Sequence, residues 1–207
     1  MFTRVLPAII AGNQEELDAM LERLLGNVEW VMLDFMDGRF VVSTALMFDL
    51  KLPKGLRYEA HLMVKTPMHN LDELRGKVES VIIHVESDGF SEALTKARSL
   101  GYEVAAAINP GTPTKLLEEH LKELDRVLVM TVEPGRYGAP FVPRALETVK
   151  YLRRLAPQLP IEVDGAMNPE NARKAREAGA NIFASGSYIM KSSDLKGAIM
   201  ALEAAVR

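Results

Sequence analysis

Two carboxylates interrupt an apolar stretch of the chain and raise the question of what they do there. Residues 30–40 read WVMLDFMDGRF, in which Asp34 and Asp37 break a run typical of a buried strand. Burying an unpaired carboxylate costs several kcal/mol or shifts its pKa. We therefore expect these acids to lie at a rim where a loop begins, or to take part in chemistry.

Two other polar residues punctuate dense apolar runs in the same way. His61 lies in YEAHLMV and Asp164 in IEVDG. An apolar strand gains nothing from an unpaired charge, so Asp34, His61 and Asp164 together are the candidates for a working site.

Three neighbouring features have simpler structural interpretations. Asp37-Gly38 and Asn109-Pro110 are typical of turns, because Asp, Asn, Gly and Pro favour turn geometry. His84 taken alone is typical of a hydrogen-bonded histidine in a core.

The elements that must position these residues alternate along the whole chain. Short, nearly continuous apolar runs are typical of parallel strands covered on both faces. We predict strands at 4–10, 28–35, 57–64, 78–86, 102–109, 126–133, 160–165 and 181–187. Amphipathic runs predict helices at 13–25, 43–52, 72–78, 91–101, 112–124, 143–155, 168–180 and 194–206, of which 43–52 has the weakest pattern.

Eight strands alternating with eight helical segments in 207 residues predict a single α/β domain, a (β/α)8 TIM barrel over residues 1–207. The competing architecture is an open, doubly wound sheet, which also alternates. Its usual Gly-x-Gly-x-x-Gly after the first strand is missing here. In a barrel the carboxyl ends of the strands form the active face, and Asp34, His61 and Asp164 all fall there.

Glycines next to the predicted strand ends indicate an anion site. Gly165 ends one strand, and Gly186 precedes Ser187 at the end of the last. Backbone N–H groups approach a phosphate closely only where side chains are absent. Gly135 and Gly138 give the loop after the sixth strand the freedom to close over a ligand.

Composition excludes several classes of function. The net charge is −3 and no Lys/Arg block stands out, so neither nucleic acid nor an anionic membrane is an expected partner. Without cysteine, the chain has no disulfide, thiolate nucleophile or Cys-type zinc site. The apolar run at the N-terminus is too short for a signal peptide, and no 18-residue apolar segment occurs. We expect a cytoplasmic protein.

Motifs in order along nearly the whole chain resemble the ribulose-phosphate 3-epimerase family. They are LDFMDGRFV (33–41), HLMV (61–64), HVE (84–86), INPGTP (108–113), VLVMTVEPG (127–135), EVDGAMNPE (162–170) and ASGS (184–187). The resemblance implies proton transfer at C3 of D-ribulose 5-phosphate, which gives D-xylulose 5-phosphate. It also implies that Asp34 and Asp164 lie on opposite sides of the sugar and alternate as acid and base.

The same resemblance implies a divalent metal, either zinc, iron, manganese or cobalt, and no organic cofactor. The family's ligands are two aspartates and two histidines, which would make Asp34, His61 and Asp164 metal ligands here. The fourth ligand is replaced by Met32, and a thioether is a poor ligand for these metals. We expect weakened metal binding.

The chain also departs from the family in its sugar-binding segments. The family's serine after the first-strand proline is Ala8, and its second glycine after the strand-7 aspartate is Ala166, whose N–H could still reach a phosphate. Residues 136–140 replace a more glycine-rich loop. Because these departures leave the glycines at the strand ends and in the loop after the sixth strand in place, we expect substrate contacts from Gly135, Gly138, Gly165, Ala166, Gly186 and Ser187.

Two other functions stay open alongside the epimerase. One is an isomerase or lyase of the same barrel class acting on another phosphosugar, with Arg136 and Tyr137 reading a different group. The related decarboxylases and hexulose-phosphate synthases are a poorer match, because Met36 stands where their Asp-x-Lys-x-x-Asp pattern needs lysine. The other is a non-catalytic phosphosugar-binding barrel. We expect a small-molecule phosphosugar as ligand and, from the resemblance, a homo-oligomer.

Overall fold

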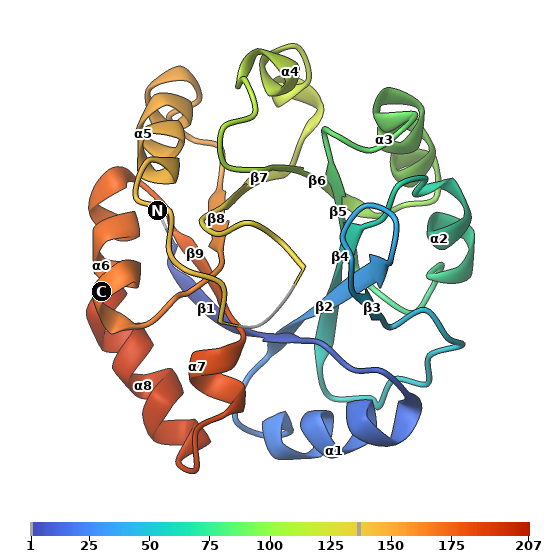
Figure 1. The fold of residues 1–207 in the computed structure, drawn as a ribbon, viewed down its shortest axis with the longest axis vertical. Coiled ribbons are helices and arrows are strands. Elements are labelled where there is room, and N and C mark those ends of the chain that lie inside the picture. Colours follow the sequence, from blue (N-terminus) through green and yellow to red (C-terminus); the bar gives the residue numbers. More distant parts are fainter. Residues whose placement is uncertain (1, 136–137) are drawn as a thin grey trace.

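A ring of strands surrounded by helices forms the fold (Figure 1). The structure is a computed structural model that describes residues 2–135 and 138–207. Its strands are β1 (Arg4–Ile9), β2 (Trp30–Asp37), β3 (Thr44–Ala45), β4 (Arg57–Met63), β5 (Ser80–His84), β6 (Glu103–Ile108), β7 (Arg126–Met130), β8 (Ile161–Asp164) and β9 (Ile182–Ser185).

The sheet closes on itself through eight parallel strands in the described residues. Their order is β1-β9-β8-β7-β6-β5-β4-β2, and a pairing of β1 with β2 completes the ring. β3 adds an antiparallel extension to β2. The predicted (β/α)8 barrel is confirmed, because an open doubly wound sheet would leave two unpaired edges.

The helices form the outer layer in the order in which the chain visits them. They are α1 (Gln14–Leu24), α2 (Met68–Glu73), α3 (Phe90–Ser99), α4 (Lys115–Glu118) with the 3-10 turn η1 (Leu121–Glu123), α5 (Ala145–Leu155), α6 (Pro169–Ala178), α7 (Ser187–Met190) and α8 (Leu195–Val206). No helix in the described part of the chain is long and apolar enough to cross a membrane.

Each strand buries both of its faces, which explains the continuous apolar runs. On β2, Val31 and Leu33 pack outward against the helical layer, whereas Trp30 and Met32 belong to a separate cluster inside the barrel. The period of two places Asp34 on the same inward face as Met32. The strand therefore delivers a carboxylate into the mouth of the barrel without breaking its outer packing.

The prediction of a helix at 43–52 is wrong. Residues 44–45 form β3, which pairs with Met36 and Asp37 of β2, and the rest of the segment is irregular. A tight turn at Gly38, with φ of +71°, reverses the chain before it could begin a helix. A hairpin thus replaces the helix that would follow β2.

Other element limits also differ from the predictions. α2 begins at Met68, before the predicted 72–78, and the predicted helix at 112–124 divides into α4 and η1. The short helix α7 after β9 was not predicted. A short extra helix at this place in a barrel commonly presents its N-terminus to phosphate.

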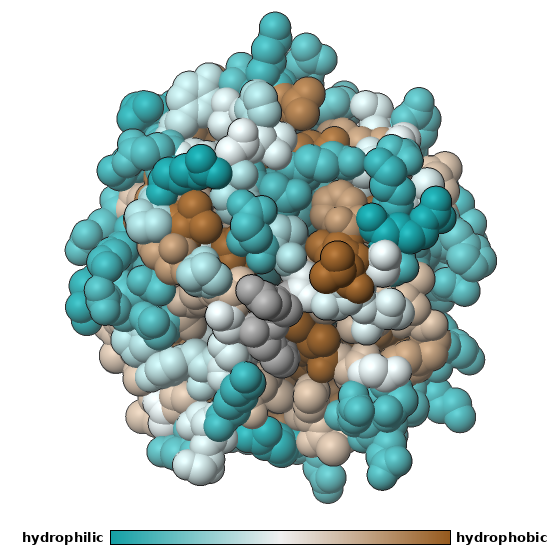
Figure 2. Space-filling model, viewed as in Figure 1, coloured by the Kyte–Doolittle hydropathy of each residue, from teal (hydrophilic) through white to brown (hydrophobic). Residues whose placement is uncertain are grey.

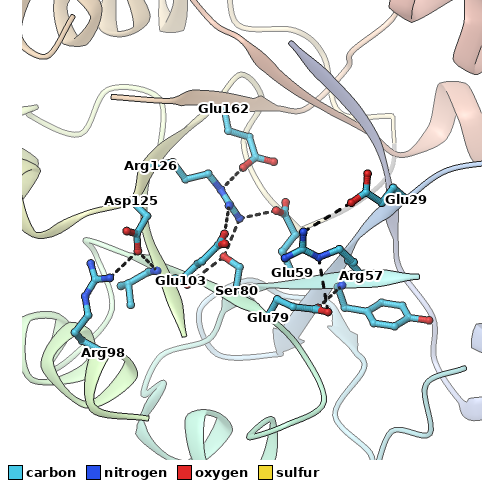
Figure 3. A network of polar contacts seen from close by, with 12 residues as sticks. Glu29, Arg57, Glu59, Glu79, Ser80, Arg98, Glu103, Asp125, Arg126 and Glu162 are labelled. Carbon is cyan, nitrogen blue, oxygen red and sulfur yellow. Dashed lines mark hydrogen bonds and ion pairs between the residues drawn. The ribbon is translucent and has the colours of Figure 1, made fainter. Parts of the chain in front are cut away.

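The barrel interior at the N-terminal ends of the strands is ionic, as Figure 3 shows. The Arg126 guanidinium lies 2.5 Å from a carboxylate oxygen of Glu59 and 2.8 Å from one of Glu162, and all three side chains are buried. Ser80 accepts a further hydrogen bond from Arg126 at 2.9 Å. Arg126 on β7 therefore connects partners on β4, β5 and β8, and this ionic group closes the barrel beneath the site.

Candidate active site

Three polar side chains converge at the carboxyl ends of their strands. Asp34 on β2 and His61 on β4 are direct register partners, and Asp164 ends β8 across the barrel. Their exposed fractions are 4%, 0% and 7%. One potential ligand atom from each lies within 4.8 Å of the others, so the structure brings together the three residues predicted as a site.

His61 is the centre of this group. Its Nδ1 lies 3.0 Å from Asp34 Oδ1 and 3.8 Å from Asp164 Oδ2. Its Nε2 lies 2.9 Å from Nε2 of His84, the buried histidine at the end of β5. Nδ1 of His84 in turn lies 3.2 Å from a carboxylate oxygen of Glu86. His84 is thus the hydrogen-bonded core histidine that the sequence indicated.

Burial shifts the proton equilibria of the acids toward neutral pH. It raises the pKa of Asp34 to about 8, with the nearby charge of Glu59 adding to the effect. Burial and then the charge of Asp34 raise the pKa of Asp164 to about 7. Both groups can therefore gain and lose a proton near pH 7, as acid–base catalysis requires.

The same burial keeps the histidines neutral. It lowers the pKa of His61, although the charge of Asp164 opposes the shift, and it lowers that of His84 to about 4. For Glu86, burial raises the pKa, but the hydrogen bond and charge of His84, together with hydrogen bonds from Thr112 and the backbone of Asn109, outweigh it, and the net shift is downward. An ionised Glu86 beside neutral imidazoles is the state near pH 7.

The donor set fits a divalent metal. Two carboxylates and one imidazole are ligands that zinc, manganese and ferrous iron all accept, and catalytic sites commonly use three protein ligands. Met32 is buried inside the barrel, two residues before Asp34 on the same face, and offers only a thioether. A metal held here would have Asp34, His61 and Asp164 as its protein ligands.

A narrow pocket opens above this group and reaches the predicted anion site. The two aspartates lie at its base with Met63 and Met130. Its lining contains every glycine-rich position predicted to contact substrate: Gly135, Gly138, Gly165, Ala166, Gly186 and Ser187. The described part of the loop after β7, up to Gly135, extends over the centre of the barrel in Figure 1. Arg136 and Tyr137 lie outside the described residues.

Figure 2 shows the surface of this face, where polar side chains form a rim and apolar ones gather nearer the centre. A larger cavity, of about 750 Å³, is lined by Arg4, Glu29, Trp30 and Arg207 among others. Neither Asp34 nor Asp164 lines it, nor does any glycine that was predicted to contact substrate, and it includes the opposite, N-terminal ends of β1 and β2. Size therefore does not identify the site, whereas chemistry does.

The turn after β8 is held in an unusual backbone conformation. Gly165 has φ of +113° and Ala166 φ of +52°, both in the left-handed region. Thr131 Oγ1 donates to the carbonyl oxygen of Gly165 at 2.6 Å, and the Asn171 amide donates to that of Ala166 at 2.8 Å. Asn171 was not predicted from the sequence as a residue of this site. Its signal was position alone, in the first turn of the helix that Asn168 caps.

Replacing Gly165 with alanine is expected to destabilise the fold and weaken binding of phosphorylated ligands. An added Cβ would lie 2.5 Å from Val132 Cγ2, and overpacking of this kind costs about 1–3 kcal/mol. Urea denaturation and titration with a sugar phosphate measure the two effects. Gly26→Ala is the matched control, because Gly26 also has positive φ but open space around it. Equal losses in both variants would contradict a specific close approach at Gly165.

Asp37 confirms the simpler interpretation of the Asp-Gly pair. Its carboxylate accepts hydrogen bonds from the backbone N–H groups of Arg39, Phe40 and Lys65, at 2.7–2.9 Å. Burial would raise the pKa of Asp37, but these bonds outweigh it and the net shift is downward. Of the two acids in the stretch at 30–40, one closes a turn and only Asp34 reaches the pocket.

Comparison with known proteins gives a family and a fold. Residues 4–190 match the model of the ribulose-phosphate 3 epimerase family. The chain is 31% identical to ribulose-phosphate 3-epimerase of Schizosaccharomyces pombe, over 98% of this chain and 93% of that protein. It is 32% identical to the chloroplastic ribulose-5-phosphate-3-epimerase of Arabidopsis thaliana, over 98% and 77%. A solved 3-hexulose-6-phosphate synthase shares the fold at 14% identity, with a TM-score of 0.72 over 99% of this chain and all of that one.

Proposed function

The chain belongs to the ribulose-phosphate 3-epimerase family, and from that premise we propose that it interconverts D-ribulose 5-phosphate and D-xylulose 5-phosphate. The observation that carries the proposal is the pair of buried aspartates at the base of one pocket, each with its pKa raised toward neutrality. Inversion at one carbon needs two proton-transfer groups, because a single base returns the proton to the face it came from.

The two acids divide the work between the faces of the sugar. One of the two residues, Asp34 or Asp164, removes the C3 proton as an ionised carboxylate. The other is protonated and delivers its proton to C3 from the opposite face. Their roles exchange in the reverse direction. The raised pKa values bring both acids close to neutral pH, where each can hold or release a proton, as a reaction that runs in both directions requires.

The rest of the pocket positions the substrate. The turn at Gly165 and Ala166, together with Gly186 and Ser187, offers backbone N–H groups for the phosphate. The loop that carries Gly135 and Gly138 lines the same pocket and limits the access of water. A divalent metal held by Asp34, His61 and Asp164 would supply positive charge to stabilise an enediolate.

The test is proton exchange in D2O. Metal-stripped protein, and protein supplied with zinc, cobalt, manganese or ferrous iron, would each be incubated with D-ribulose 5-phosphate and followed by NMR. Deuterium at C3 together with D-xylulose 5-phosphate is the expected result. Binding of the sugar phosphate without exchange under every metal condition would contradict the proposal. That outcome would favour a barrel that only binds phosphosugars. Met32 is consistent with this alternative, because its thioether is a poor replacement for a metal ligand.

Two further expectations stay predictions. The cytoplasmic location is supported by a rice relative named as the cytoplasmic isoform, whereas the Arabidopsis relative is chloroplastic. A homo-oligomer rests on the resemblance to the family, and light scattering of the purified chain would measure its mass.

A further inference from the structure

A line of three side chains leads from the edge of the barrel mouth to the two aspartates. Glu86 Oε2 lies 3.2 Å from His84 Nδ1, His84 Nε2 lies 2.9 Å from His61 Nε2, and His61 Nδ1 faces Asp34 and Asp164. Both imidazoles are fully buried, while the Glu86 side chain is 21% exposed. Every ring nitrogen in the line therefore has a polar neighbour. In each contact one atom must donate a hydrogen and the other must accept it.

The carboxylate of Glu86, at the outer end of the line, determines which ring nitrogens carry hydrogen. Glu86 accepts the backbone N–H of Asn109 on its other oxygen at 2.9 Å, so it acts as an acceptor on both sides. His84 Nδ1 must then carry a hydrogen and donate it to Glu86. In a neutral imidazole the second nitrogen is an acceptor, so His84 Nε2 accepts a hydrogen bond from His61 Nε2–H.

From this order we infer that Glu86 and His84 are positioning residues that keep the hydrogen of His61 on Nε2 and leave the Nδ1 lone pair facing the two aspartates. The reversed order would set the lone pair of His84 Nδ1 against the carboxylate of Glu86 at 3.2 Å, two acceptors with no hydrogen between them. The inference rests on the proposed site. It goes beyond the site by assigning a task to two residues outside the pocket.

Packing holds the line in place. The rings of His61 and His84 stack with centroids 5.1 Å apart. The ring centroid of Phe40, in the hairpin after β2, lies 4.8 Å from that of His84. A lone pair fixed in direction is what a metal ligand needs, and partners beyond the ligand typically change metal affinity about 10- to 100-fold.

The first test needs no mutation. A long-range 1H–15N correlation spectrum of metal-free protein labelled with 15N-histidine reports which nitrogen of each ring carries hydrogen. The chain has four histidines, and the side chains of His69 and His120 are 79% and 21% exposed, so they serve as internal references. Hydrogen on Nε2 of His61 and on Nδ1 of His84 is expected. Hydrogen on Nδ1 of His61, or on both of its nitrogens, would overturn the inference.

Glu86→Gln tests the consequence. The amide NH2 would donate to His84 Nδ1, reverse both imidazoles and remove the lone pair from the site. We expect the dissociation constant for Co²⁺ to rise about 10- to 100-fold together with a change in the His61 spectrum. Glu118→Gln is the matched control, because Glu118 also accepts a side-chain hydrogen bond, from Tyr151, but lies on α4 in the outer layer.

Unchanged Co²⁺ affinity with an unchanged His61 spectrum in Glu86→Gln would overturn the assignment. If Glu86→Gln does not fold, the wild-type spectrum decides alone. Neither measurement depends on turnover. A protein that fails to exchange the C3 proton but shows hydrogen on His61 Nε2 would contradict the proposed function and leave this inference standing.

Discussion

Asp34→Asn and Asp164→Asn are each expected to lower kcat by about 10²- to 10⁴-fold, the usual contribution of a general acid or base. An amide neither accepts nor delivers the C3 proton, while its size leaves the pocket open to the sugar phosphate. The dissociation constant for a phosphorylated ligand should therefore stay within a few-fold of wild type. Steady-state kinetics and ligand titration measure the two quantities, and wild-type turnover in either variant would refute the two-acid assignment.

The same substitutions should raise the stability of the metal-free protein. Burial raises the pKa of Asp34 to about 8 and of Asp164 to about 7, above their values in the unfolded chain. A group with a raised carboxyl pKa binds its proton more tightly when folded, so its ionisation opposes folding as pH rises through this range. Metal-free wild type should thus lose stability between about pH 4 and 8, and asparagine at either position should reduce that loss.

Asp49→Asn is the control for both measurements. Asp49 is 85% exposed, pairs with Lys77 on the surface and lies outside the pocket. Its loss should change neither turnover nor the pH dependence of unfolding, because exposed ion pairs contribute little. Loss of turnover without a gain in stability at Asp34 would indicate that its carboxylate is paired in the folded protein rather than poised for proton transfer.

The barrel could be predicted from the sequence because each strand is buried on both faces. The resulting apolar runs are local signals, and their alternation with amphipathic runs persists along the chain. The hairpin after β2 could not be recognised in the same way. Residues 43–52 contain Ala45, Leu46 and Leu50, which are buried like the apolar stripe of a helix, but they pack against β2 and the core through irregular backbone. Tertiary contact overrode the local pattern there.

The structure brings together the three residues that the sequence predicted as a site, but the contacts that connect them were not predicted. Asp34, His61 and Asp164 stood out because each interrupts an apolar strand. The direct pairing of Asp34 with His61 depends on the register of β2 and β4, and the line from His61 to Glu86 spans the ends of β4 and β5. The pairing of Arg126 with Glu59 and Glu162 is likewise set by the closure of the barrel. Sequence spacing contains no information on such contacts until the strand order is known.

Met32→His is expected to tighten metal binding by at least about 10- to 100-fold, since a ligand should count for as much as the partners that support one. Position 32 precedes Asp34 by two residues on the inward face of β2, so an imidazole there would point into the same interior as the carboxylate. Competition with a chelator for Zn²⁺ or Co²⁺ measures the affinity. Met32→Leu is the control, because it keeps an apolar side chain of similar size and offers no ligand atom.

The metal-free Met32→His protein should also be less stable than wild type, by about 1–3 kcal/mol, because position 32 is fully buried and the imidazole would lack a partner there. Adding metal should reverse this loss in Met32→His and have a smaller effect in Met32→Leu, since a ligand that binds only the folded state stabilises it in proportion to its affinity. Thermal unfolding with and without metal separates the two variants. Equal metal affinity in both would mean that position 32 does not face the metal, and that Asp34, His61 and Asp164 form the complete protein ligand set.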